Sequence, residues 1–316
     1  MAAPKITDAD FIKLFDELGP RKLADKIGSA AQGVFKRRRN LEKKHGIVLS
    51  GPQPQEHFQA QSIPGRLHLA VNNGIVLIGS DLHAWPGEPS TAFRAFVAFI
   101  KEMQPKAVIL DGDVIDGASV SRHPPLGWEK LPSLIEEIEA AQERLHEIEL
   151  AAPKRAELIW PAGNHDARFS IRLATVAPEY ARIHGTHLKD HFGDRWQPCW
   201  SIWINDGGVV VKHRARGGVH ASYNSTLHGG KTIVHGHLHS LKVTPFVDYN
   251  GRRWGVDCGC LADIYGPQFA YAEDNVRNWS SGFAVLTFKD SQLLQPELCV
   301  VHSPGVVEWR GERRNV

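Results

Sequence analysis

Residues 107–116 read Ala-Val-Ile-Leu-Asp-Gly-Asp-Val-Ile-Asp, an apolar run that passes directly into three carboxylates. An uninterrupted apolar run without polar alternation is typical of a strand that is covered on both faces of its sheet. The chain contains four further runs of this kind, at residues 75–78, 158–160, 209–211 and 232–234. These five runs are therefore predicted to be buried strands.

Helical stretches separate the first three of these runs, at residues 91–103 and 131–150. Residues 284–288 and 298–301 are expected to add late strands. This alternation of strand and helix predicts an α/β domain.

Each predicted buried strand leads into side chains that can bind a metal ion. The clusters are Asp81/His83, Asp113 with Asp116, Asn164-His165-Asp166, His213, and His237/His239. Ligands gather at the carboxyl ends of strands in open α/β sheets, and residues two apart on extended backbone point to the same side. Glycines at 112, 163 and 236 are expected to let the backbone turn and approach the ions.

Composition agrees with metal chemistry, because seventeen of the 316 residues are His, the commonest protein ligand for transition metals. No run of eighteen apolar residues occurs, so we expect no membrane span. The N-terminus has acidic residues where a signal peptide would be apolar. The four cysteines lack zinc-finger spacing, which favours buried, reduced thiols and a cytoplasmic location.

The ordered set D-x-H, G-D-x-x-D, G-N-H-D, a strand-terminal His and G-H-x-H resembles the calcineurin-like metallophosphoesterase family over residues 81–239. Gly259-Cys-Leu261, Asn278-Trp279 and Gly282-Phe283 look like the phage and prophage branch of that family. The resemblance implies an αββα sandwich for residues 66–316 and hydrolysis of phosphoester bonds.

The resemblance also implies two divalent ions and seven ligands. The ligands would be Asp81, His83 and His239 for one ion, Asn164, His213 and His237 for the other, and Asp113 as the bridge between them. Mixed nitrogen and oxygen ligands suit Mn²⁺, Zn²⁺ or Fe better than Mg²⁺ or Ca²⁺, and Mn²⁺ is the metal that we expect. Two such ions can bind a phosphoryl group and stabilise its in-line displacement.

The family pattern implies that His165 is the general acid, and we expect Asp166 to orient its imidazole ring. Asp116 is expected to support a ligand rather than to bind an ion. His123 and Arg168 are candidates for contact with the substrate phosphate, with a solvated loop and an ion pair as the alternatives.

Two further histidines leave the ligand set open. Family members commonly have Gly after the strand-terminal His, but Arg214 follows His213 here, so His220 in a Gly-rich loop competes with His213. We favour His213 because it leaves the strand directly. His235 is expected to be a buried, hydrogen-bonded histidine.

The first 48 residues differ in charge from the rest, with eleven Lys and Arg against six Asp and Glu, a net charge of +5, whereas the remainder has 26 against 29, or −3. Helices are predicted at 8–18, 22–27 and 30–44, with a break at Gly19-Pro20. The spacing of Ala24, Gly28 and Val34 resembles a helix-turn-helix.

In the last of these helices, the run Lys36, Arg37, Arg38 and Arg39 would contact phosphates, and Gln32 or Asn40 could address base edges. A basic helix that only packs as a cap is the alternative. Pro and Gln between residues 49 and 65 predict a linker between a domain at 1–48 and one at 66–316.

The predicted function is metal-dependent hydrolysis by a phosphodiesterase or nuclease that acts on nucleic acid. The alternatives are a phosphoprotein or nucleotide phosphatase, and a DNA-binding regulator with an inactive phosphoesterase domain. The presence of all seven ligands argues against an inactive domain.

Overall fold

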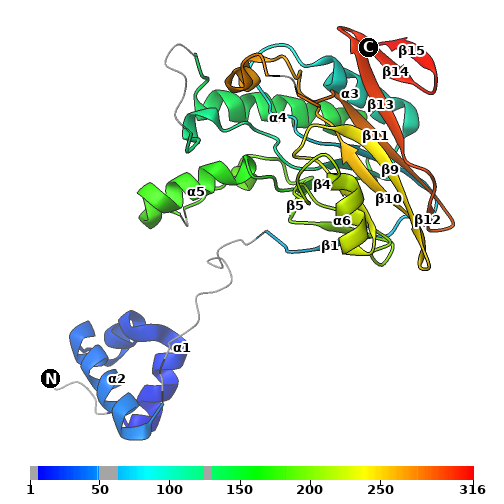
Figure 1. Ribbon diagram of the computed structural model, residues 1–316. Coiled ribbons are helices and arrows are strands. Elements are labelled where there is room, and N and C mark those ends of the chain that lie inside the picture. The colour runs from blue at the N-terminus through cyan, green and yellow to red at the C-terminus, as the bar shows by residue number, and fades with distance from the viewer. Residues whose placement is uncertain (1–5, 48, 50–62, 124–129, 182, 276) are drawn as a thin grey trace. The chain divides into compact units, whose positions relative to one another are not determined.

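The computed structural model describes residues 6–47, 49, 63–123, 130–181, 183–275 and 277–316 (Figure 1). The chain divides into two compact units, Met1–Ser62 and Ile63–Val316. Most of the predicted linker, residues 50–62, lies outside the described residues.

The first unit contains two helices, α1 (Asp8–Ile27) and α2 (Ala31–His45). The two predicted helices at 8–18 and 22–27 are joined in α1, which is interrupted at Gly19 by a φ of 73°. Gly28 ends α1 with a left-handed φ of 64°, a conformation that costs glycine little. Side chains from both helices share a small core, which comprises Phe11, Phe15, Leu23, Ala24, Val34, Leu41 and Leu49.

The second unit is built on two sheets. Strands β2 to β5 of the larger sheet pair in parallel, and β11 pairs antiparallel to β2. In sheet order the larger sheet comprises β15 (Glu312–Asn315), β14 (Val306–Trp309), β13 (Glu297–Ser303), β11 (Gly282–Lys289), β2 (Gly74–Gly79), β3 (Ala107–Leu110), β4 (Glu157–Pro161) and β5 (Trp196–Cys199), with β12 (Gln292–Leu293) paired to β11.

The smaller sheet is mixed, with β7, β8 and β10 parallel to one another. In sheet order its strands are β1 (Leu67–Leu69), β6 (Ile202–Ile204), β7 (Val209–Val211), β8 (Thr232–His235), β10 (Gly251–Cys258) and β9 (Leu241–Asp248).

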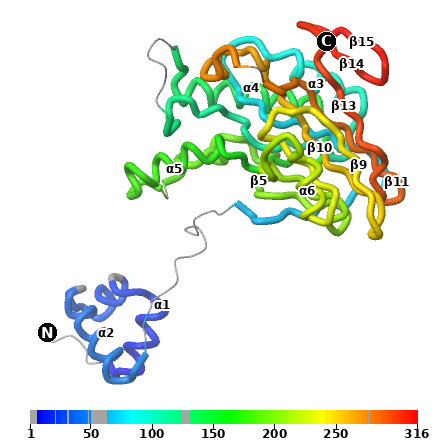
Figure 2. The backbone as a smooth tube through the Cα atoms, in the orientation of Figure 1, coloured from blue at the N-terminus to red at the C-terminus, as the bar shows by residue number. Residues whose placement is uncertain are grey.

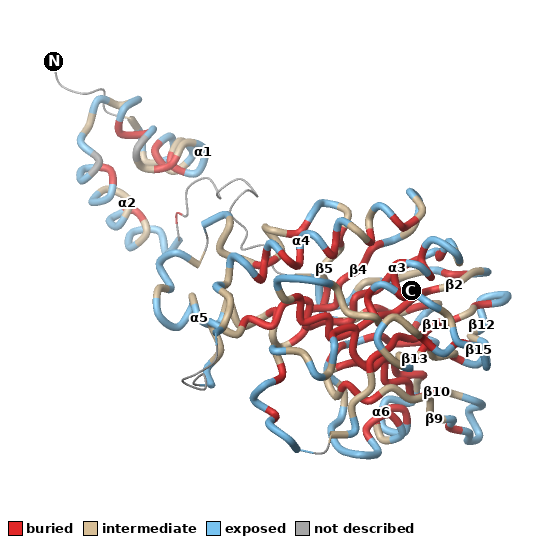
Figure 3. The backbone as a smooth tube through the Cα atoms, turned by 90° about the horizontal axis from the view of Figure 1, so that it is seen from above, coloured by how far each residue is buried: buried red, intermediate tan, exposed pale blue. Residues whose placement is uncertain are grey.

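Alternation along the strands separates two cores. In β2, Val76 and Ile78 join side chains from the smaller sheet, whereas Leu77 joins those of α3 (Thr91–Met103) and α4 (Leu134–Ala151). Both helices therefore cover the outer face of the larger sheet (Figure 1). Buried residues are concentrated in the sheets (Figure 3).

On the smaller sheet, α6 (Ala221–Gly229) forms the opposite outer layer, where Thr226 Oγ1 donates to the carbonyl of Trp254 at 3.1 Å. The layers are thus α, β, β and α, and the predicted sandwich is confirmed.

Shorter elements complete the second unit. Helix α5 (Asp166–Val176) follows β4, and its course is visible in Figure 2. Asp166, its first residue, is buried, and the rest of the helix is not. The 3₁₀ turns are η2 (Ala118–Val120), η3 (Pro178–Tyr180), η4 (Leu188–Asp190) and η5 (Pro267–Ala272). Among the described residues, no helix combines the length and apolar character needed to cross a membrane. All four cysteines are buried and free, as expected.

Candidate metal centre

The ends of five strands bring the predicted ligands together. Asp81 and His83 follow β2, Asp113 follows β3, and Asn164 follows β4. His213 follows β7 of the smaller sheet, and β8 leads into His237 and His239. Backbone hydrogen bonds join the loops: the amide of His83 donates to the carbonyl of Asp113 at 2.9 Å, and that of Gly236 to His213 at 3.2 Å.

Three overlapping groups of side chains are close enough to hold an ion: Asp81/His83/His239, His83/Asp113/His165 and Asp113/His213/His237. Asp81 Oδ1 lies 3.0 Å from His239 Nε2 and 3.8 Å from His83 Nε2. Asp113 Oδ2 lies 3.1 Å from His213 Nε2. Asp113 belongs to two of the groups, a position suited to a bridging carboxylate.

Polar atoms that lack a hydrogen-bond partner show whether the group of proposed ligands fits metal ions. Within the described part of the chain, His83 Nε2, Asn164 Oδ1, His213 Nε2 and His239 Nδ1 are buried without a hydrogen bond. Buried polar atoms are normally paired, because an unpaired one loses its hydration. All four atoms belong to proposed ligands, and each comes from a different strand exit, so the donor set fits divalent cations.

Backbone conformation is strained at the same residues. Asp81, His83, Asp113, His237 and His239 all have positive φ, between 39° and 71°. Such conformations cost about 1–3 kcal/mol each for non-glycine residues and persist where the surroundings impose them. Five of the seven proposed ligands are therefore held in place at a cost in stability, as is common at functional sites.

The expected glycines approach the ligands closely. A Cβ at Gly112 would lie 2.5 Å from the ring of His213, and one at Gly163 would overlap Asp113 Oδ1. A Cβ at Gly236 would lie 2.5 Å from Asp81 Oδ2. Only Gly112 has positive φ, so the other two serve close approach rather than an unusual turn.

Charge coupling sets the protonation of the cluster. Burial alone would raise the pKa of Asp81, but the charges of His239 and His213 hold it well below its ordinary value. Burial would lower the pKa of His83, yet the carboxylate of Asp116, 2.9 Å from its Nδ1, and the nearby carboxylate of Asp81 raise it to about 10. Burial lowers the pKa of His237 to about 4.

The predicted role of Asp166 is wrong. Its carboxylate does not contact the His165 ring in the described structure; it accepts from the amides of Val114 and Gly163 at 2.8 Å and from Trp160 Nε1 at 2.9 Å. Asp166 is the first residue of α5 and faces back toward the exit of β3. It therefore holds the two loops that carry Asp113 and Asn164.

Asp116 takes the place expected for Asp166. His165 Nδ1 lies 2.8 Å from the carbonyl of Asp116 and 3.2 Å from its Oδ1. Asp116 Oδ1 also lies 2.9 Å from His83 Nδ1, as expected for a residue that supports a ligand. A single carboxylate thus orients one proposed ligand and the proposed general acid.

Arg168 contacts the other side of His165. Its Nη2 lies 3.0 Å from His165 Nε2, and its Nη1 donates to the carbonyl of Asp116 at 2.8 Å. Arginine can only donate, so in this arrangement Nε2 is the acceptor and Nδ1 carries the ring proton. The ion-pair alternative for Arg168 is present, with Asp116 Oδ2 at 3.6 Å.

The competing histidines occupy different environments. His213 is buried, whereas His220 is exposed at the start of α6. His235 is buried and lies 3.2 Å from Ser222 Oγ and 3.0 Å from the carbonyl of Gly236. His123 is exposed and lines the same pocket as His165 and Arg168.

Aromatic side chains around His83 and His239 were not predicted as part of the site. The ring of Phe269 contacts both histidines, with centroids at 5.0 and 5.2 Å, and Trp279 lies 4.6 Å from His239. The Asn278-Trp279 pair in the sequence was the available signal for this wall, whereas nothing distinguished Phe269 from a core residue.

The basic run on α2 is divided by its contacts within the first unit. Arg37 donates to the carbonyl of Ile6 at 2.7 Å and to Asp8 at 3.0 Å, and Arg38 to Glu42 at 2.9 Å. Both arginines are half-buried, whereas Lys36 and Arg39 are exposed.

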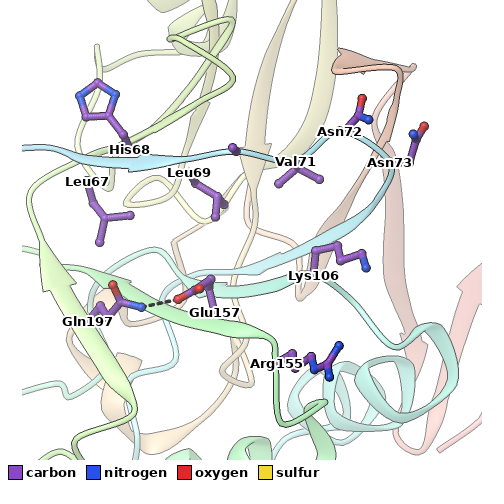
Figure 4. Close-up of a pocket in the computed structure, with 11 residues that line it drawn as sticks. Leu67, His68, Leu69, Val71, Asn72, Asn73, Lys106, Arg155, Glu157 and Gln197 are labelled. Carbon is purple, nitrogen blue, oxygen red and sulfur yellow. Dashed lines mark hydrogen bonds between the residues drawn. The ribbon is translucent and has the colours of Figure 1, made fainter.

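Another pocket, of about 660 Å³, lies at the amino ends of β3 and β4, away from the strand exits (Figure 4). Leu67 and Leu69 point toward the Glu157 and Gln197 pair, and His68 points away. Among its described lining residues there is no proposed ligand, so it is separate from the metal centre.

Comparison with known proteins shows which family the chain is similar to. A family model for calcineurin-like phosphoesterases matches residues 75–257. The Gene 54 protein of Mycobacterium phage D29 is 30% identical over 67% of this chain and 88% of its own length, and that of phage L5 is 28% identical over the same shares. Among solved structures, a dimetal phosphatase from Danio rerio aligns with 9% identity and a TM-score of 0.37, over 73% of this chain and 96% of its own.

The chain therefore belongs to the calcineurin-like phosphoesterase family. It is a metallophosphoesterase of the type found in these phages, a hydrolase that acts on phosphoester bonds.

Proposed function

We propose that the chain is a phosphodiesterase that acts on nucleic acid through a dinuclear metal centre. The proposed ligands are Asp81, His83 and His239 for one ion and Asn164, His213 and His237 for the other, with Asp113 as the bridge. Mn²⁺ is the preferred metal because imidazole and carboxylate donors are mixed, with Zn²⁺ or Fe as alternatives. When bound, the two ions would polarise the phosphoryl group and activate water.

His165 is the proposed proton donor to the leaving oxygen. The carbonyl and the carboxylate of Asp116 both face Nδ1 of this ring and fix its orientation. Donation from Nε2 requires that this atom be protonated and that Arg168 release it. Arg168 is then free to contact the substrate phosphate. A single movement of Arg168 away from His165 would therefore make both the proton donor and the guanidinium group available to the substrate.

The observation that carries the substrate proposal is the exposed face of α2. Gln32, Lys36, Arg39, Asn40 and Lys43 are all exposed, and their spacing of three or four residues places them on one side of the helix. We call these five residues the α2 face. Cations would neutralise phosphates, and the two amides could reach base edges.

The turn before α2 supports a helix-turn-helix arrangement. Ala24 and Val34 are buried in the same small core, and Gly28 occupies the left-handed turn between the helices. The three-residue connection from Gly28 to Ala30 has the length usual for this motif. Arg37 and Arg38 are assigned to holding the unit together rather than to binding phosphates.

Location of the protein in the cytoplasm stays a prediction.

Substrate panels test the proposal. The full chain with Mn²⁺ is assayed on bis(p-nitrophenyl) phosphate, p-nitrophenyl phosphate, single- and double-stranded DNA, RNA and a phosphopeptide. We expect cleavage of the diester and of nucleic acid, with loss of both in Asp113→Ala. Hydrolysis restricted to monoesters or phosphopeptides would overturn the nucleic-acid proposal.

A further inference from the structure

A pocket of about 410 Å³ opens beside His165, and part of its lining consists of side chains to which the proposed chemistry gives no role. The seven proposed ligands are absent from its described lining. Its volume lies in the range of small-molecule sites, which runs from about 300 to 1,000 Å³. The lining residues are Trp85, Asp116, Ala118, Ser121, His123, Leu131, His165, Arg168, Pro267, Gln268 and Tyr271.

One wall of this pocket belongs to the reaction. His165 and Arg168 meet there at 3.0 Å, and Asp116 supports both. If His165 protonates the leaving oxygen, the group attached to that oxygen must lie in this pocket. The pocket therefore faces the leaving group of the substrate. The rest of the substrate would lie on the side of the proposed metal ligands, outside this pocket.

The lining of the pocket also contains aromatic side chains, one of which contacts a ring that packs on the proposed ligands. Phe269 of η5 is buried against His83 and His239, and two residues later Tyr271 is 58% exposed, with its ring centroid 6.4 Å from that of Phe269. Trp85, two residues after the proposed ligand His83, is half-buried. The pocket thus combines Tyr271 and Trp85 with the polar side chains of Gln268 and His123.

We propose that this pocket binds the nucleoside of the leaving group, with its base against Tyr271 and Trp85. This inference rests on the proposed function. Bases stack on aromatic side chains whatever their identity, and Gln268 can donate to and accept from a base edge. A pocket of this volume holds one nucleoside and not a base pair, so the substrate must present an unpaired base.

Oligonucleotides in which one nucleotide lacks its base test this assignment. Short single-stranded DNA and RNA oligonucleotides are compared with versions that carry one abasic residue at successive positions. In the wild-type chain we expect kcat/KM to fall about 5- to 150-fold when the missing base is the one on the leaving side of the cleaved bond, the range for loss of one stacked base. Tyr271→Ala should reduce that ratio toward 1, and Tyr271→Phe should restore it.

Tyr265→Ala is the matched control, because Tyr265 is 85% exposed on the same segment and is absent from the described lining of the pocket. It should keep the full ratio. An unchanged ratio in Tyr271→Ala, or no base dependence in the wild-type chain, would overturn the proposal.

A second measurement separates this inference from the proposed function. Adenosine and ribose are compared as inhibitors of bis(p-nitrophenyl) phosphate hydrolysis, a readout that does not require nucleic acid to be cleaved. Inhibition by adenosine alone, lost in Tyr271→Ala, supports the nucleoside pocket even if no oligonucleotide is hydrolysed. Equal inhibition by both, or a phosphotyrosine peptide preferred to oligonucleotides and sensitive to Tyr271→Ala, contradicts it.

Discussion

Individual ligands in this chain combine strained backbone with unpaired polar atoms. His83 and His239 each have positive φ, and each leaves one buried ring nitrogen without a hydrogen bond in the described structure. A bound ion can offset these unfavourable contributions to the free energy of folding, because the free energy of metal binding adds to it. Chelation should therefore lower the melting temperature of the chain.

The choice between His213 and His220 can be tested by metal counting. His213→Ala removes a buried donor 3.1 Å from Asp113 Oδ2 and should lower the bound Mn²⁺ from two ions to one. His220→Ala removes an exposed ring and should leave two. Elemental analysis and calorimetric titration give the stoichiometry. Loss of metal in the second variant alone would reverse the assignment.

Metal affinity should rise with pH because of His83. In chelator-treated protein its pKa is raised to about 10, mainly by Asp116 and Asp81 acting against burial, so the ring is protonated at neutral pH. An ion needs the neutral ring, and binding must release that proton. We expect affinity for Mn²⁺ to increase about tenfold per pH unit from pH 6 to 8.5 for each proton released.

The same shift has the opposite effect on the metal-free fold. A raised histidine pKa stabilises the folded state fully below the ordinary value near 6.5, and this stability is lost as pH rises toward 10. Melting temperatures with and without Mn²⁺ should therefore diverge as pH rises, and His220→Gln should behave like the wild type. Affinity that does not change with pH would contradict the protonated state of His83.

At the scale of elements, the strand exits depend on glycines that leave room for ligands. Gly163→Ala would place a methyl group against Asp113 Oδ1 and its backbone amide. We expect loss of Mn²⁺ binding and of diester hydrolysis, with a destabilisation of about 1–3 kcal/mol, the usual cost of overpacking.

Gly217→Ala is the control, since no atom lies within 4 Å of a Cβ added there. Thermal melts and activity should match the wild type in that variant. Retained metal in Gly163→Ala would mean that the loops after β3 and β4 can separate.

Several elements could be predicted from sequence because their own residues decide them. The apolar run at 107–110 is β3, and the stretch at 91–103 is α3. Strands β9 and β10 could not, because β10 begins Gly-Arg-Arg and contains Gly255, a pattern typical of a loop. Pairing of β10 with β8, and the packing of α6 on Gly255, make it a strand.

The residues of the site also divide into those that the sequence predicts and those that depend on tertiary contacts. Candidate ligands were visible as motifs at strand ends, whereas the support for His165 was assigned to its neighbour Asp166. The actual contact comes from Asp116, 49 residues earlier in the chain, through the exit of β3. Sequence spacing indicates which residues leave strands together, but not which loops meet.

At the scale of the whole molecule, the two units have separate cores and different charges. Residues 1–48 have a net charge of +5 and the remainder −3. Attraction to a polyanion is therefore expected from the first unit, whereas the second contains the proposed ligands. Hydrolysis of a small diester and binding of nucleic acid should respond to different substitutions.

The last prediction uses this separation within the full chain. Replacing Lys36, Arg39 and Lys43 of the α2 face by Ala should weaken DNA or RNA binding and reduce the log–log salt slope by up to about three units, since each phosphate contact contributes roughly 0.9. Replacing the exposed Lys13, Lys22 and Lys26 of α1 removes the same charge from the other helix. Anisotropy titrations at several salt concentrations should show a smaller loss there, and both variants should hydrolyse bis(p-nitrophenyl) phosphate normally. Equal losses of affinity in the two variants would mean that net charge rather than the α2 face attracts nucleic acid. If neither variant loses affinity, the catalytic unit alone must bind nucleic acid.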